Sequence, residues 1–132
     1  MNDAEFIEAF EACTLEPFHH ADHIRAGWIY LERHPTLEAI TKFTAGLKRF
    51  AQSKGAPQLY HETITWAYLL LINQRRLRTP DITTWPAFRE NNPDLLTWKP
   101  GILDTYYDPA TLASPLARAV FLMPNAPSRS LA

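Results

Sequence analysis

Residues 60–78, YHETITWAYLLLINQRRLR, predict the central helix of an all-α protein. The segment carries helix-favouring residues throughout and ends in Arg75, Arg76 and Arg78, whose charges are favourable at the negative end of a helix. Its middle is apolar on nearly every face, and such a helix is usually the buried one of a bundle. We therefore expect it to contact all the other helices of the bundle.

Three amphipathic helices are expected before this segment. Apolar residues recur at spacings of three and four over residues 3–13 and 20–34, and again in a stripe from Leu37 to Phe50. Pro17 and Pro35 interrupt the pattern, and Gly55 is suited to the C-terminal cap of the third helix. Residues 1–78 are thus predicted to form a compact bundle of about four helices.

Proline punctuates the rest of the chain. From Pro80 to Pro127 a proline recurs every several residues, so only short helices fit, with candidates at 85–91, 111–113 and 115–121 and turns at 91–94 and 99–101. Apolar residues continue through this part, so we expect residues 79–125 to wrap the bundle as a lid. The chain then forms one helical domain over residues 1–125, followed by a flexible tail at 126–132.

Composition excludes several classes of function. The chain has 132 residues, is 46% hydrophobic and carries a formal charge of -1, which argues against nonspecific binding to nucleic acid or to anionic lipid. Its only cysteine, Cys13, leaves no intramolecular disulfide. The acidic start lacks the features of a secretory signal, and the longest apolar run is far shorter than the ~20 residues of a membrane span. A cytoplasmic protein is the expectation.

Two histidine clusters are candidates for a metal site. His20 and His23, or alternatively His19 and His23, share one face of a predicted helix, while His61 and Glu62 begin the central helix. Two or three imidazoles with one carboxylate and an open position suit a catalytic divalent transition metal: zinc, iron, copper, nickel or manganese. We therefore predict His20, His23, His61 and Glu62 as metal ligands.

The second cluster, His61 and Glu62, also allows interpretations without a metal. The run from His61 to Thr65 matches only the first half of the His-Glu-x-x-His motif, because Thr65 stands where the second histidine belongs. His61 and Glu62 are alternatively a general acid and base in a metal-free pocket. The simplest alternative is a cap or surface arrangement, since a glutamate is electrostatically favoured at a helix N-terminus.

Four further residues are candidates for contacts with a substrate. Thr65 shares a helix face with His61, and Arg25 is a second polar residue on the first histidine helix. Arg118 is the lone charge of an apolar stretch, where a guanidinium could receive a carboxylate or phosphate, although such arginines more often pair internally. Tyr106 could close a pocket with its hydroxyl, or lie at the rim of the core.

Two motifs resemble those of a largely uncharacterised family of small bacterial helical proteins. Residues 18–28, FHHADHIRAGW, are similar to its Phe-x-His-x-x-His pattern with Ala-x-Trp or Ala-Trp soon after, and residues 60–65, YHETIT, to its Tyr-His-Glu-Thr pattern. Its ending resembles Tyr106-Tyr107, Ser114, Ala117-Arg118 and Pro124-Asn125. The resemblance implies His20, His23, His61 and Glu62 as the shared polar set, leaves His19 out, and implies no particular reaction.

Two hypotheses follow for the function. The first is a small helical metalloprotein, with a hydrolase or an oxygenase as the reaction classes left open, acting on a small molecule beneath the lid. The alternative is a non-catalytic module without metal that binds a small molecule or a protein. Neither involves nucleic acid or a membrane, and a homodimer is compatible with both.

Overall fold

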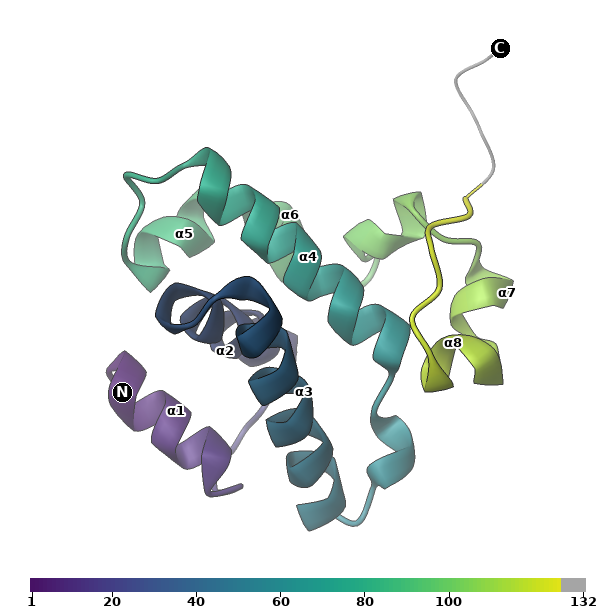
Figure 1. The fold of residues 1–132 in the computed structure, drawn as a ribbon, viewed down its shortest axis with the longest axis horizontal. Helices are drawn as coiled ribbons and strands as arrows, with labels where there is room; N and C mark the ends of the chain where they lie inside the picture. Colours follow the sequence, from purple (N-terminus) through teal and green to yellow (C-terminus); the bar gives the residue numbers. More distant parts are fainter. Residues whose placement is uncertain (127–132) are drawn as a thin grey trace.

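The computed structural model describes residues 1–126, and this part of the chain contains helices and no strand (Figure 1). The α-helices are α1 (Asp3–Glu11), α2 (His20–Arg33), α3 (Thr36–Ser53), α4 (Glu62–Arg78), α5 (Trp85–Asn91), α6 (Pro93–Leu96), α7 (Pro109–Leu112) and α8 (Pro115–Ala119). Two short 3₁₀ helices are η1 (Pro57–Leu59) and η2 (Ile102–Thr105). The all-α prediction is confirmed. Of the predicted flexible tail, residues 127–132 lie outside the described residues.

Local capping fixes where the long helices begin and end. The side chain of Asn2 accepts the backbone N–H of Glu5 at 2.8 Å and caps α1. That helix ends just before Cys13, whose φ of 60° leaves the helical region. Gly55 follows α3 with a φ of 71°, a conformation that glycine adopts at little cost. The residues at the helix ends therefore largely determine where α1 begins and where α1 and α3 end.

The close contact between α2 and α4 depends on Gly27. A Cβ atom at this position would lie 3.0 Å from Cδ2 of Leu69 and 3.3 Å from Cδ1 of Ile72. Helix α4 also packs on α3 and α8, whereas α1 packs mainly on α2 and α3. The outer face of α4 carries Leu70 and Leu77, which are 42% and 63% exposed. The central helix is thus buried on part of its circumference, less than its apolar sequence predicts.

Aromatic side chains join the helices in the core. The ring of Phe10 on α1 stacks on Phe43 and Phe50 of α3, with centroids 5.7 and 6.0 Å apart. On the other side of α2, Trp28 packs against Trp85 and Phe88 of α5. The first helices and the proline-punctuated segment therefore share one apolar core.

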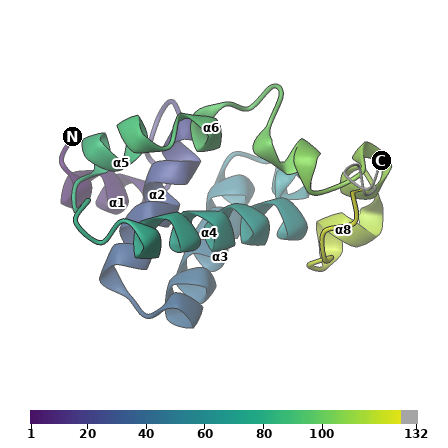
Figure 2. The same cartoon turned by 90° about the horizontal axis from the view of Figure 1, so that it is seen from above.

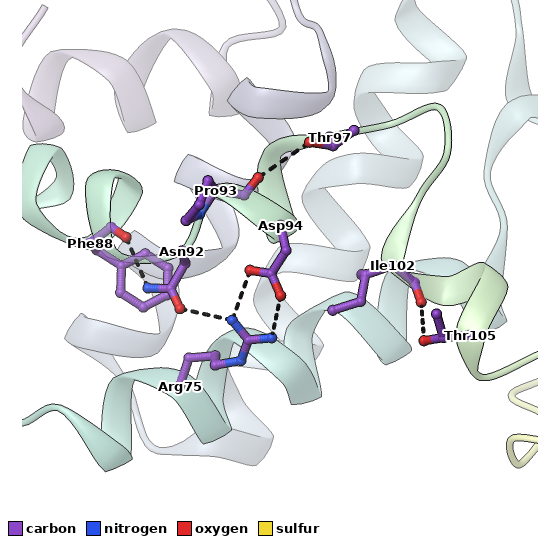
Figure 3. A network of polar contacts seen from close by, with 8 residues as sticks. All are labelled: Arg75, Phe88, Asn92, Pro93, Asp94, Thr97, Ile102 and Thr105. Atoms are coloured by element: carbon purple, nitrogen blue, oxygen red, sulfur yellow. Dashed lines mark hydrogen bonds and ion pairs between the residues drawn. The ribbon is translucent and has the colours of Figure 1, made fainter. Parts of the chain in front are cut away.

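The C-terminal segment first packs on α2 through α5 and α6. It then returns to the start of α4, where α8 packs (Figures 1 and 2). Arg75 near the end of α4 donates to both carboxylate oxygens of Asp94, at 3.0 and 2.8 Å, and to Oδ1 of Asn92 at 3.0 Å (Figure 3). Buried Asn92 in turn donates to the carbonyl of Phe88 at 2.9 Å. This network fixes α5 and α6 against α4, and Arg75 lowers the pKa of Asp94 by hydrogen bonding.

No helix within residues 1–126 combines the length and the hydropathy needed to cross a membrane.

Candidate ligand-binding cavity

A cavity of about 630 Å³ lies between α2, α3 and α4, with further walls from η1, Trp98 and Arg118. Most of its lining side chains are apolar, among them Phe18, Ile24, Phe43, Leu47, Phe50, Ile64, Leu69 and Ile72. Small-molecule sites are typically apolar cavities of roughly 300–1,000 Å³ with a few convergent polar groups. Both the size and the lining of this cavity fit that description.

Several predicted site residues meet at this cavity. His20 and His23 reach it from α2, and His61 and Thr65 reach it from the beginning of α4. Arg118 reaches it from α8. The structure thus brings the two histidine clusters to one cavity. Glu62 does not line the cavity.

Both ring nitrogens of His61 are engaged with the backbone. Its Nδ1 accepts the N–H of Ile64 at 3.1 Å, so the side chain caps α4, and its Nε2 donates to the carbonyl of Leu112 at 2.7 Å. The hydroxyl of Thr65 donates to the carbonyl oxygen of His61 at 2.7 Å. Burial lowers the pKa of His61, so the ring stays neutral near pH 7 and fixes the fold locally.

His20 is held in a comparable way at the start of α2. Its Nε2 lies 2.8 Å from the carbonyl oxygen of Leu95 on α6. The ring packs between Tyr68 and Trp98, with centroid distances of 4.9 and 5.0 Å. Burial lowers the pKa of His20, and the bond to Leu95 partly opposes that effect. His20 therefore links the bundle to the C-terminal segment while forming part of the cavity wall.

His23 differs from these two histidines, because its ring nitrogens form none of the hydrogen bonds found within residues 1–126. Its ring stacks on Phe18 with centroids 4.1 Å apart. Burial, with a smaller contribution from nearby His20, lowers the pKa of His23 to about 4. A neutral imidazole with free nitrogens therefore lies on the wall of an otherwise mostly apolar cavity.

Glu62 pairs with a tyrosine. The hydroxyl of Tyr60 donates a hydrogen bond to the Glu62 carboxylate, and burial together with this carboxylate raises the pKa of Tyr60. His61 directs its two nitrogens to the backbone instead. The predicted acid and base are therefore each hydrogen-bonded to other groups, and no hydrogen bond joins them.

The described residues contain no group of three or more His, Cys, Asp or Glu side chains placed to hold one metal ion. A metal shared by His20, His23 and His61 would require His61 to give up a backbone hydrogen bond. The metal would also have to bind the one ring nitrogen of His20 that is not bonded to Leu95. The metal centre stays a prediction of the sequence.

Two predicted substrate-binding residues lie away from the cavity. Arg25 donates to the carboxylate of Asp3 at 3.0 Å and lies over the ring of Phe6, 4.3 Å from its centroid, so it fixes α1 to α2. Tyr106 is 39% exposed and lines neither cavity described here. Asp22, beside the histidines, accepts the backbone N–H of His19 at 2.9 Å and thus stabilises the start of α2.

Four residues outside the predicted site also line the cavity: Lys54, Tyr60, Tyr68 and Trp98. Tyr68 and Trp98 also border a second cavity of about 430 Å³, which Asp104 lines as well. The Tyr68 hydroxyl is buried and has no hydrogen-bond partner in the described part of the chain. Tyr60 belongs to the Tyr-His-Glu-Thr motif, whereas Lys54, Tyr68 and Trp98 belong to no motif and only their spatial neighbours reveal them.

Comparison of the chain with protein-family models, with curated proteins and with solved structures finds no match. The likeness of its motifs to a bacterial family therefore stays a prediction, and the functional argument rests on the cavity itself.

Proposed function

We propose that this protein binds a small, largely apolar molecule in the cavity between α2, α3 and α4. The observation that carries the proposal is the unpaired imidazole of His23 on the wall of this cavity. Its ring nitrogens are not among the buried polar atoms that lack a partner, so they are accessible from the cavity and a ligand group can form a hydrogen bond with them. The apolar walls supply the affinity, and His23 supplies orientation and selectivity.

The other histidines support the site in this proposal. His20 and His61 are bonded to the carbonyls of Leu95 and Leu112, so they shape the wall and hold the C-terminal segment in place. Helices α2, α3 and α4 frame the cavity, and residues 79–125 act as its lid, with Trp98 packed on His20. Binding is favoured over catalysis because both ring nitrogens of His61 are bonded to the backbone and Glu62 does not line the cavity.

A neutral apolar fluorophore, N-phenyl-1-naphthylamine, tests the proposal directly. We expect saturable binding with one site per chain. Ala51→Phe fills the cavity from α3 and should weaken binding by about tenfold or more, whereas Ala45→Phe on the exposed face of the same helix should not. Ala56→Phe, a second cavity-filling change, serves if Ala51→Phe does not fold. Absence of saturable binding, or equal binding to the filled variants and the control, would overturn the proposal.

Metal content separates this proposal from the metal hypothesis. The measurement is mass spectrometry of untagged protein, for the parent chain and for His23→Ala and His61→Ala. Near-stoichiometric metal that is lost in both variants would support a metal centre in place of a metal-free binding site. We expect His61→Ala to lower stability through its two backbone bonds and to leave the metal content unchanged.

A further inference from the structure

We infer that the ligand of this cavity is an organic anion, with an apolar body inside and its anionic group held at the edge by Lys54 and Arg118. This inference names the chemical class of the ligand and rests on the proposed function. Three observations support the inference: the sign of the charges on the cavity wall, the placement of Lys54 and Arg118, and the helix ends that border the cavity.

The charged side chains of the cavity wall all have one sign. Among the described residues that line it, Lys54 and Arg118 are the lysine and arginine, and no aspartate or glutamate is present. An anion therefore finds two cations at this wall and no carboxylate facing it.

Arg118 is positioned for such a contact. One terminal nitrogen donates to the carbonyl of Gln58 at 2.8 Å and lies 3.4 Å from that of Tyr60, which holds the guanidinium beside η1. Its other nitrogens form no hydrogen bond within residues 1–126. Neither Arg118 nor Lys54 takes part in the ion pairs of this part of the chain. The guanidinium is thus ordered on one side and free to bind a carboxylate or phosphate on the other.

The partial charges at the helix ends add to the positive charge of these two side chains. The starts of α2 and α4, at His20 and His61, both border the cavity, and each helix N-terminus carries about half a positive charge. The end of α3 contributes the opposite partial charge, and Lys54 follows it directly. In Figure 1 the start of α4 and α8 lie side by side on the right, while α3 ends at the bottom of the view and the loop with η1 joins it to α4. The balance favours an anion.

Two carboxylates that do not line the cavity, those of Glu62 and Asp104, indicate the direction of the ligand. Glu62 accepts the hydroxyl of Tyr60 and does not line the cavity. Asp104 borders the second cavity, beyond Tyr68, and would repel an anion there. The anionic group of the ligand therefore lies at Lys54 and Arg118, with its apolar part directed inward.

Three probes with the same ten-carbon chain test the inference: decanoate, decanol and decyltrimethylammonium, each competing with N-phenyl-1-naphthylamine at low salt. We expect decanoate to bind about tenfold more tightly than decanol, and the cation to bind most weakly. Arg118→Gln and Lys54→Gln should each weaken decanoate several-fold and leave decanol unchanged. Lys42→Gln, on the exposed face of α3, is the matched control.

The outcomes distinguish this inference from the function on which it rests. If neither the fluorophore nor any ten-carbon probe binds, the proposed function is wrong. If decanol binds as tightly as decanoate, or if Arg118→Gln and Lys54→Gln leave the preference intact, the cavity binds apolar molecules and the inference about charge is wrong. Arg118→Lys, which keeps the charge, should retain much of the preference and so separates a charge effect from a folding effect.

Discussion

The imidazole of His61 joins two distant parts of the chain, with Nε2 2.7 Å from the carbonyl oxygen of Leu112 and Nδ1 accepting the N–H of Ile64 at 3.1 Å. Because Nδ1 accepts, the proton must lie on Nε2. One neutral ring therefore caps α4 and fastens the end of α7 to it. This relationship makes His61 a structural residue whose replacement has a calculable cost.

His61→Ala should lower the free energy of unfolding by about 2 kcal/mol, about half from the lost helix cap and half from the lost bond to Leu112. Urea denaturation at pH 7 measures the change. His61→Asn is the informative comparison, because asparagine caps a helix well but is too short to retain both contacts. It should recover about half of the loss. Equal losses in the two variants would show that capping contributes nothing.

Acidification should destabilise the protein through His23. Its pKa is lowered from 6.5 to about 4 in the folded chain, so below pH 6.5 the unfolded chain binds the proton more readily. The stability is therefore fully present above pH 6.5 and decreases as the pH falls toward 4, by up to about 3 kcal/mol. His20 and His61 shift in the same direction and add to the slope. Urea denaturation over this pH range measures it.

His23→Leu should flatten this pH dependence, because the titrating group is removed. A slope that is equally steep in the parent chain and in His23→Leu would contradict the assignment of the effect to His23.

Gly27→Val should destabilise the protein by about 1–3 kcal/mol through overpacking. A Cβ alone would lie 3.0 Å from a methyl carbon of Leu69, and the γ-methyl groups of valine add further crowding between α2 and α4. Ala45→Val places the same side chain on an exposed helix position and should cost only about 0.5 kcal/mol. Thermal unfolding of the two variants compares them. Equal shifts would mean that the helices separate easily at Gly27.

The long helices could be predicted from the sequence because their apolar spacing and their caps act locally. The same holds for the short helix after Thr84, whose hydroxyl caps α5. Helix α6 was missed: residues 91–94 were predicted as a turn, but Pro93 occupies the first position of a helix, where its missing N–H costs nothing. Local signals thus fixed the elements better than their exact boundaries.

That the two histidine clusters lie at one cavity could also be expected from the sequence. The hydrogen-bond partners of each ring could not be. His20 and His61 bind the backbone carbonyls of Leu95 and Leu112, which lie 75 and 51 residues away and have no sequence signature. Any residue type offers such an acceptor. The tertiary fold alone therefore decides that these two rings each bind a distant carbonyl and that the His23 ring binds none of those in residues 1–126.

Tyr68→Phe should leave the stability of the ligand-free protein unchanged or raise it slightly. The Tyr68 hydroxyl is buried without a hydrogen-bond partner among residues 1–126, so the substitution removes an uncompensated polar group and keeps the ring. Tyr107→Phe is the matched control, because the hydroxyl of buried Tyr107 donates to the carbonyl of Leu122 at 2.8 Å. It should cost about 1 kcal/mol. Urea denaturation of both variants checks the contrast, and an equal loss in the two would show that the Tyr68 hydroxyl has found a partner in solution.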